Sequence, residues 1–308
     1  MRIASMGWGA MVQKKRVSRA GAAANRDADR AESSPRRQRA GRNGGDPRRT
    51  GSAARGAQAP EASGAVYIEG WRAAEEALQT GFPIKRALLA ENDRDQRAVQ
   101  LAQHLGASGV PVAYVPRAEL DARSNRGAHQ GVILEAGAFP YVGIEDVIAG
   151  AGTGAALVVV LDHVTDEGNL GAIARSAEVV GASGLVIANK RAAGVGAGTF
   201  KASAGAVMHL PIARVPNLPR AIDQLKEAGF WVVGATEHAE ATCWDAPLDG
   251  RIALVMGSEG EGLSHLVRQK CDTLAKLPQR GRIESLNVAQ ATTVLCYEWM
   301  RRSWDAIK

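Results

Sequence analysis

The sequence predicts an α/β protein whose C-terminal half forms a mostly parallel β-sheet covered by helices on both faces. Three observations predict this fold class. Strand-like and helix-like segments alternate from residue 66 to residue 302, the run ALVVVLDHV at 156–164 is apolar enough for a strand buried on both faces, and polar or glycine-rich loops follow several strands. In such sheets, ligands bind beyond the C-terminal ends of the strands.

Residues 1–63 are predicted to form a disordered basic tail. They hold 14 Lys and Arg against 5 Asp and Glu, a net charge of +9, whereas residues 64–308 carry a net charge of −3. The stretch 34–60 nearly lacks large aliphatic residues, so it cannot bury enough apolar surface to offset the entropy of ordering. Its arginines suit salt-sensitive contacts with phosphates, and a solvated linker without a partner is the equal alternative. The acidic residues at 27, 29, 32 and 46 argue against an organelle transit peptide.

Residues 64–140 are predicted to form a small α/β domain, because helical and strand-like patterns alternate there. The helices are expected at 71–78, 94–109 and 117–124. The strands are expected at 84–92, 110–116 and 129–139. A short helical segment closing in glycine, 141–154, makes 141–155 the expected linker.

Residues 156–308 are predicted to form the larger domain, a β-α series around the parallel sheet. Its strands are expected at 156–164, 184–189, 211–215, 230–236, 251–259 and 273–278. Its helices are expected at 168–181, 198–210, 218–229 and 264–271, followed by a final helix that starts at Ser285–Asn287. Ser and Asn at a helix start are ordinary caps, because their side-chain oxygens accept backbone N–H groups.

The cysteines and histidines do not predict a metal site. Cys243, Cys271 and Cys296 are far apart and form no C-x-x-C pair, and the six histidines form no spaced cluster with them, so no disulfide framework is expected either. No apolar run approaches the ~18 residues of a membrane span. The sequence therefore predicts a soluble cytoplasmic protein from a reducing compartment.

The first candidate loop of the larger domain is DHVTDEGNLGAIARSA. It places Asn169 in a glycine-flanked turn and Arg175 six residues later, and both are expected to face the same cleft at the strand ends. The structural alternative is that Asn169 caps the helix and Arg175 is a solvated surface charge.

Two further loops are expected at the same edge of the sheet. VMGSEGEGLS contains Gly257, where the backbone can approach a ligand closely, and Glu259, which is either a helix N-terminal acid or a site carboxylate. LPQRGRIESLNVAQ brings Ser285 and Asn287 to the start of the final helix. The chain has no G-K-[ST] after a glycine loop and no G-x-G-x-x-G after the first strand, so nucleotide hydrolysis and dinucleotide binding lose support.

Together these loops resemble a known family. NLGAIARSA, VMGSEGEGLS and LPQRGRIESLNVAQATTVLCYE are similar, in order and spacing, to the three motifs of the SpoU (TrmH-like) RNA ribose 2′-O-methyltransferases of the SPOUT superfamily, and TFKASAGAVMHLPIARV is similar to a segment that these proteins share. The resemblance covers 156–302. IEGWRAAEEAL and RGAHQGV resemble the L30e-like substrate-recognition domain of the subgroup that methylates a guanosine in large-subunit ribosomal RNA.

The resemblance implies a C-terminal domain tied in a deep trefoil knot, a homodimer with sites at the interface, and S-adenosylmethionine as cofactor. The cofactor would be held largely by backbone groups at Gly257, Leu277 and Leu286, with Thr236 as a further candidate. The implied substrate is a guanosine of 23S ribosomal RNA. Transfer RNA, an adenosine target and a non-catalytic RNA-binding protein of the same fold are the alternatives.

The family's pattern implies that Arg175 is the central catalytic residue. A ribose 2′-OH is a very weak acid that must attack the sulfonium methyl in line, so the enzyme must orient both groups and help the hydroxyl lose its proton. A guanidinium is a poor base, and Arg175 is therefore either a proton acceptor in a strongly perturbed site or, as we favour, a cation that stabilises the developing alkoxide. The side chains implied to orient Arg175 and the ribose are Asn169, Glu259, Ser285 and Asn287. No metal is required.

Overall fold

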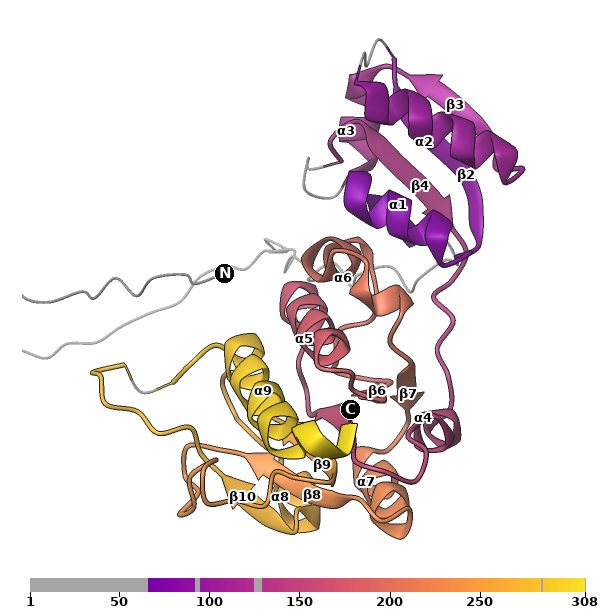
Figure 1. Cartoon of the computed structure of the whole chain (residues 1–308). Coiled ribbons are helices and arrows are strands. Elements are labelled where there is room, and N and C mark those ends of the chain that lie inside the picture. Colours follow the sequence, from indigo (N-terminus) through magenta and orange to yellow (C-terminus); the bar gives the residue numbers. More distant parts are fainter. Residues whose placement is uncertain (1–65, 92–94, 125–128, 284, 308) are drawn as a thin grey trace, which may run out of the picture. The chain divides into compact units, whose positions relative to one another are not determined.

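The computed structural model describes residues 66–91, 95–124, 129–283 and 285–307 (Figure 1). The predicted tail, 1–63, lies outside these residues. Within them the chain forms two β-sheets, of four and six strands. No helix in the described ranges is long and apolar enough to cross a membrane.

The N-terminal sheet has the order β1-β4-β2-β3. Its strands are β1 (Val66–Glu69), β2 (Ile84–Ala90), β3 (Val112–Val115) and β4 (Val132–Ala136). Three helices accompany them, α1 (Trp71–Gln79), α2 (Gln96–Ala107) and α3 (Arg117–Arg123). β4 is antiparallel to both of its neighbours, and β2 and β3 are parallel. The sequence did not predict β1, a four-residue edge strand too short to show a clear alternation.

The C-terminal sheet has the order β10-β8-β9-β5-β6-β7, and all its neighbouring strands run parallel. Its strands are β5 (Ala156–Leu161), β6 (Gly184–Ala188), β7 (Ile212–Val215), β8 (Trp231–Ala235), β9 (Arg251–Met256) and β10 (Thr273–Ala275). The predicted fold class is thus confirmed. The trefoil knot stays a prediction.

Helices cover both faces of this sheet. One face packs on α5 (Glu167–Val179), α6 (Ala197–Ser203) and α9 (Val288–Ile307), and the other on α4 (Ile144–Gly150), α7 (Leu218–Glu227) and α8 (His265–Lys270). Along β5, Leu157, Val159 and Leu161 join the first face while Val158 and Val160 join the second. A strand between two helical layers must be apolar at every position, which explains the continuous apolar run in the sequence.

The single helix predicted at 198–210 is wrong. α6 ends at Ser203, and a short 3₁₀ helix, η1 (Ala206–Met208), follows it. Ala204 and Gly205 between them both adopt positive φ, 50° and 91°, which a continuing α-helix does not allow. Gly171 of α5 explains how closely α5 and α6 pack, because a Cβ there would lie 2.6 Å from the Thr199 carbonyl oxygen.

Candidate active site

Asn169, Glu259 and Asn287 form a hydrogen-bonded triad at the C-terminal edge of the large sheet. Asn169 Nδ2 donates to Glu259 Oε1 over 2.9 Å, and Asn287 Nδ2 donates to the same oxygen over 2.6 Å. Asn287 Nδ2 also lies 3.0 Å from Asn169 Oδ1. The three residues come from α5, from the turn after β9 and from the start of α9. The structure therefore joins one residue from each of the three predicted loops.

Of the two helix caps that the sequence suggested, Asn169 on α5 and Asn287 on α9, only the second is present. Asp166 caps α5, since its Oδ1 accepts the Asn169 backbone N–H over 2.8 Å, so the Asn169 side chain is not the cap. Asn287 does cap α9, because its Oδ1 accepts the Ala289 N–H over 2.9 Å. Glu259 accepts both amide hydrogen bonds of the triad and is not in the first turn of α8, which begins at His265, so it is not a helix N-terminal acid and its role as a site carboxylate stays a prediction.

The turn after β9 folds back tightly on itself. Ser258 and Gly262 exchange two backbone hydrogen bonds, of 3.1 and 3.0 Å. Gly257 precedes them, and a Cβ at this position would lie 2.2 Å from the Gly262 carbonyl carbon. Only glycine can therefore occupy 257 without moving the backbone, and the turn brings Glu259 over the ends of β5 and β9.

A pocket of about 290 Å³ opens beside this turn, at the ends of β8, β9 and β10. The four predicted cofactor-binding residues all line it: Thr236, Gly257, Leu277 and Leu286. Ser285 and Glu259 line it as well. Val288 and Leu295 of α9 add apolar surface, and Glu237 and Lys276 add charge. Such a lining fits S-adenosylmethionine, because aliphatic side chains can cover a purine ring while carboxylate and backbone groups meet hydroxyl and charged ends.

Arg175 lies outside this pocket. Its side chain is exposed, and it makes no hydrogen bond or ion pair with the described residues. Six residues of α-helix rotate a side chain by about 600°, or about 240° beyond one full turn, so Asn169 and Arg175 point in different directions. The expectation that both face one cleft is not met within a single chain.

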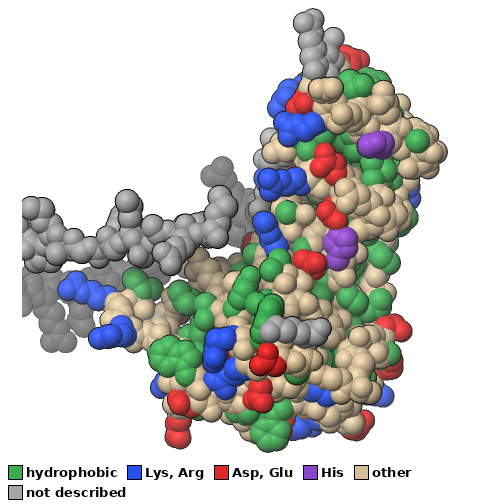
Figure 2. Space-filling model, in the orientation of Figure 1, with side chains coloured by type: hydrophobic (Ala, Val, Ile, Leu, Met, Phe, Trp, Pro, Cys, Tyr) green, Lys and Arg blue, Asp and Glu red, His purple; other side chains and the backbone are tan. Residues whose placement is uncertain are grey.

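The helix that carries Arg175, α5, contacts α9, which bears an apolar surface. Ser176 Oγ and Thr293 Oγ1 lie 2.7 Å apart and connect α5 to α9. Four large side chains of this surface are between 45% and 67% exposed: Trp244, Val294, Tyr297 and Trp304. They line a groove of about 770 Å³, and Figure 2 shows hydrophobic side chains gathered over α9 on the face in view. We call this set of four residues the α9 face.

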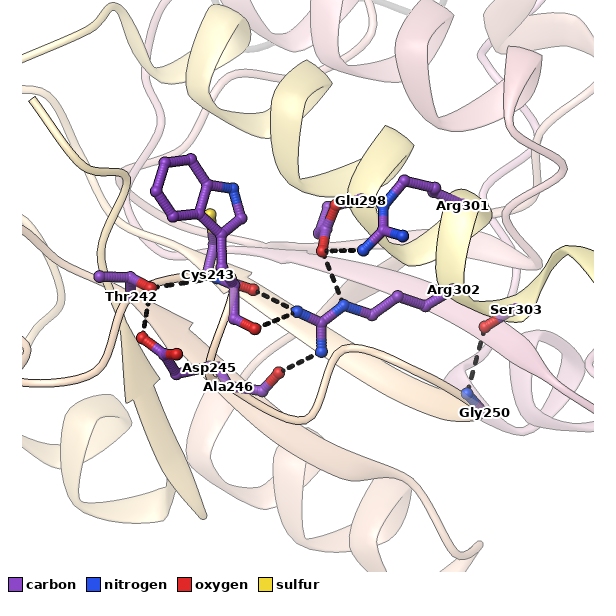
Figure 3. A network of polar contacts seen from close by, with 10 residues as sticks. Thr242, Cys243, Asp245, Ala246, Gly250, Glu298, Arg301, Arg302 and Ser303 are labelled. Atoms are coloured by element: carbon purple, nitrogen blue, oxygen red, sulfur yellow. Dashed lines mark hydrogen bonds and ion pairs between the residues drawn. The ribbon is translucent and has the colours of Figure 1, made fainter.

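A clasp around Arg302 holds the loop between β8 and β9 against α9 (Figure 3). The Arg302 guanidinium donates to the carbonyl oxygens of Cys243, Trp244 and Ala246 over 3.0, 2.6 and 2.8 Å, and its Nε donates to Glu298 over 2.7 Å. Hydrogen bonds from Arg301 and Arg302 lower the pKa of Glu298 to about 2. The same loop begins at Thr236 and Glu237, which line the pocket at the ends of β8, β9 and β10.

The cysteines are free thiols with raised pKa values. Burial raises the pKa of Cys271 and Cys296 to about 12 and raises that of Cys243 as well. Thiolates are therefore scarce at neutral pH, and the thiols are poor nucleophiles. In the described part of the chain, no group of three His, Cys, Asp or Glu could hold a metal ion.

Sequence reasoning missed Asp162 and His163, which directly follow β5. Asp162 is buried, and its Oδ1 lies 2.6 Å from His163 Nδ1. His163 lines a second cleft beside Asn169 and Glu259. The available signal was the polar pair immediately after the central apolar strand, where ligand sites of parallel sheets are found.

The comparisons with known proteins agree with this geometry. Residues 156–297 match the model of the SpoU rRNA methylase family, and residues 67–142 match the model of the RNA 2′-O ribose methyltransferase substrate-binding domain. YacO of Bacillus subtilis, whose name places it in the TrmH family of tRNA/rRNA methyltransferases, is 38% identical over 238 residues, which cover 77% of this chain and 95% of that protein.

Two solved structures resemble this chain over more than three quarters of its length. The SpoU methyltransferase AviRb from Streptomyces viridochromogenes, solved with AdoMet, has a TM-score of 0.69 and 27% identity over 78% of this chain and 90% of its own. The AdoMet-bound rRNA methyltransferase from Sinorhizobium meliloti has a TM-score of 0.65 and 29% identity, over 77% and 87% of the two chains.

Proposed function

Because the chain belongs to the SpoU (TrmH) family of S-adenosylmethionine-dependent RNA ribose 2′-O-methyltransferases, we propose that its substrate is a guanosine of 23S ribosomal RNA. The observation that carries this proposal is the N-terminal domain, which matches the substrate-binding model over 67–142. The sequence of this domain also resembles that of the subgroup acting on large-subunit RNA. The neighbour from Sinorhizobium meliloti is an rRNA methyltransferase by its description, which supports the same choice.

The triad would orient the target ribose. The cofactor supplies the methyl group and the leaving group. Asn287 uses both of its N–H donors within the triad and its Oδ1 as the cap of α9, so it fixes Asn169 and Glu259. The second N–H of Asn169 and the Oε2 atom of Glu259 would hold the ribose hydroxyls in line with the methyl group. Ser285 lines the same pocket and would add a hydroxyl contact. Gly257, Leu277, Leu286 and Thr236 would hold the cofactor.

Arg175 would act as a cation at the developing alkoxide, with the hydroxyl proton released to solvent. A charge without a partner among the described residues is free to contact an anionic group. Since Arg175 is outside the pocket of its own chain, we propose that it reaches the site of a second copy.

The second copy would dock on the α9 face. A stripe of exposed aromatic and aliphatic side chains on α9 and the loop before β9 is the kind of surface that two copies cover in a two-fold dimer. Such a dimer would bury Trp244, Tyr297 and Trp304 and bring α5 of each chain towards the site of the other. These arguments support the homodimer that the resemblance implies.

The test is transfer of labelled methyl from S-adenosylmethionine to 23S, 16S and transfer RNA, each transcribed without modifications, followed by mapping of the methylated ribose. We expect label in 23S RNA alone, at one guanosine. Label only in transfer RNA would overturn the proposed substrate but keep the enzyme. No label in any RNA, with the cofactor still bound, would favour an RNA-binding protein of the same fold. Arg175→Ala serves as the inactive control.

A further inference from the structure

A second cleft of about 240 Å³ adjoins the cofactor pocket at the ends of β5 and β9. It shares Ser258, Glu259, Gly260 and Val288 with that pocket, and His163 to Asp166 and Asn169 form its other wall. Glu259 of the triad therefore borders both clefts, and Asn169 borders the second. A nucleotide whose ribose lies at the triad has the methyl donor on one side and this second cleft on the other.

His163 has a fixed orientation in the wall of the second cleft. Its Nδ1 lies 2.6 Å from Asp162 Oδ1, while Asp162 Oδ2 accepts the Ser264 backbone N–H over 2.7 Å. An ionised carboxylate only accepts hydrogen bonds, so Nδ1 is the donor to Asp162, and Nε2 is an acceptor whenever the ring carries a single proton. Nε2 has no partner among the described residues, and a third of the side chain, 33%, is exposed.

The backbone of His163 is also unusual. Its φ is +62°, in the left-handed region that non-glycine residues seldom adopt. Residues in such conformations cluster at functional sites, where the surrounding structure holds them. The adjacent buried Asp162 holds the ring here, since the two side chains are hydrogen-bonded.

The charged side chains around the cleft are carboxylates, and no Lys or Arg is among the residues that line it. The acceptors are the carboxylates of Asp166 and Glu259 and, in the neutral ring, His163 Nε2, while Thr165, Asn169 and Ser258 add side chains that can also donate. Asp166 uses Oδ1 as the cap of α5, and its Oδ2 has no partner in the described part of the chain. A cleft with these charges repels a phosphate and favours a group rich in N–H donors.

We propose that the second cleft holds the base of the methylated nucleotide by its N–H edge, with His163 Nε2 and the Asp166 carboxylate as acceptors. Guanine fits best among the four bases, because its ring N–H and exocyclic amino group lie side by side on the Watson–Crick edge. His163 is then a base-contacting residue that also sets where the ribose lies. This inference rests on the proposed function and adds a site for base selection to it.

The test uses short synthetic RNAs that span the mapped methylation site and carry guanosine or inosine there, because inosine lacks only the amino group. The variants are His163→Gly, which suits the positive φ and removes the imidazole, and Asp166→Asn, which keeps a good helix cap and removes the charge. His163→Asn is the matched control that tolerates the same backbone conformation and retains a hydrogen-bonding side chain.

We expect wild type to prefer guanosine over inosine by about tenfold in kcat/KM, which corresponds to one hydrogen bond of about 1.4 kcal/mol. His163→Gly and Asp166→Asn should raise the KM for guanosine RNA and reduce the preference, with cofactor Kd unchanged, and His163→Asn should retain part of the preference. Equal preference in wild type and both variants would overturn the inference. Methylation mapped to another base would overturn the guanine assignment alone, whereas no methylation of any RNA would overturn the proposed function as well.

Discussion

Two residues of α5, Asn169 and Arg175, lie in very different surroundings. Asn169, near the start of the helix, is fixed by Glu259 and Asn287, whereas Arg175 is exposed and has no partner among the described residues. One chain thus assembles the hydrogen-bonded triad, whereas Arg175 lies apart from it. Under the proposed function, binding and charge stabilisation would be divided between surfaces that meet only on association.

The largest expected effect comes from Arg175→Ala. If Arg175 stabilises charge only in the transition state, kcat should fall by about 100-fold or more while cofactor binding is retained, as for other residues that stabilise developing charge. Steady-state kinetics and calorimetric titration of the cofactor measure the two quantities. Arg175→Lys is the matched control, because it keeps the charge and loses the planar fork. Loss of cofactor binding in Arg175→Ala would place this side chain in the pocket of its own chain.

A mixing experiment decides whether Arg175 acts across an interface. Arg175→Ala and Glu259→Ala chains, each inactive alone, are unfolded together and refolded. If Arg175 serves the partner's site, half of the dimers are mixed and each has one complete site, so about a quarter of wild-type activity should return. If Arg175 serves its own chain, no activity returns. Tyr297→Glu on the α9 face should give monomers in sedimentation and prevent recovery.

The clasp around Arg302 determines how rigid the α9 face is before association. Arg302→Met keeps an unbranched apolar side chain in place of the methylene groups of Arg302 and removes its four hydrogen bonds. We therefore expect the free energy of unfolding, measured with urea, to fall by about 2 kcal/mol. Cofactor affinity should also fall, because the loop beyond the clasp lines the pocket. Unchanged cofactor affinity in a destabilised variant would show that the two ends of the loop act independently.

The smallest effect concerns Glu298. Its pKa is about 2 in the folded chain, below the ordinary 4.5, because Arg301 and Arg302 donate to it. A lowered carboxyl pKa contributes stability that is complete above pH 4.5 and is lost as the pH falls towards 2. Urea unfolding between pH 5 and pH 3 should therefore show a loss of stability, and Glu298→Gln should lose less. An equal slope in both proteins would assign the pH dependence to other carboxyls.

The sequence predicted the sheet and the triad for the same reason. Apolar runs mark strands, and the ends of parallel strands share one edge, so Asn169, Glu259 and Asn287 were expected together although up to 118 residues separate them. The expectation that Arg175 faces the same cleft as Asn169 within one chain is not met, because closeness in sequence does not fix the direction of a side chain on a helix, and its catalytic role stays a prediction. The break at Ala204 and the left-handed backbone of His163 were missed because tertiary contacts select such conformations at residues without a strong preference for them.

The turn at Gly257 limits how the cofactor pocket can be redesigned. A side chain at 257 would collide with the backbone of Gly262, so its position cannot be used to make room for an enlarged methyl-donor analogue or to narrow the pocket against one. Leu277 and Leu286 also line the pocket, and Leu286 is 47% exposed, so it can change size without disturbing the core. An engineer who wants this enzyme to transfer a larger alkyl group should vary those two leucines and leave the turn unchanged.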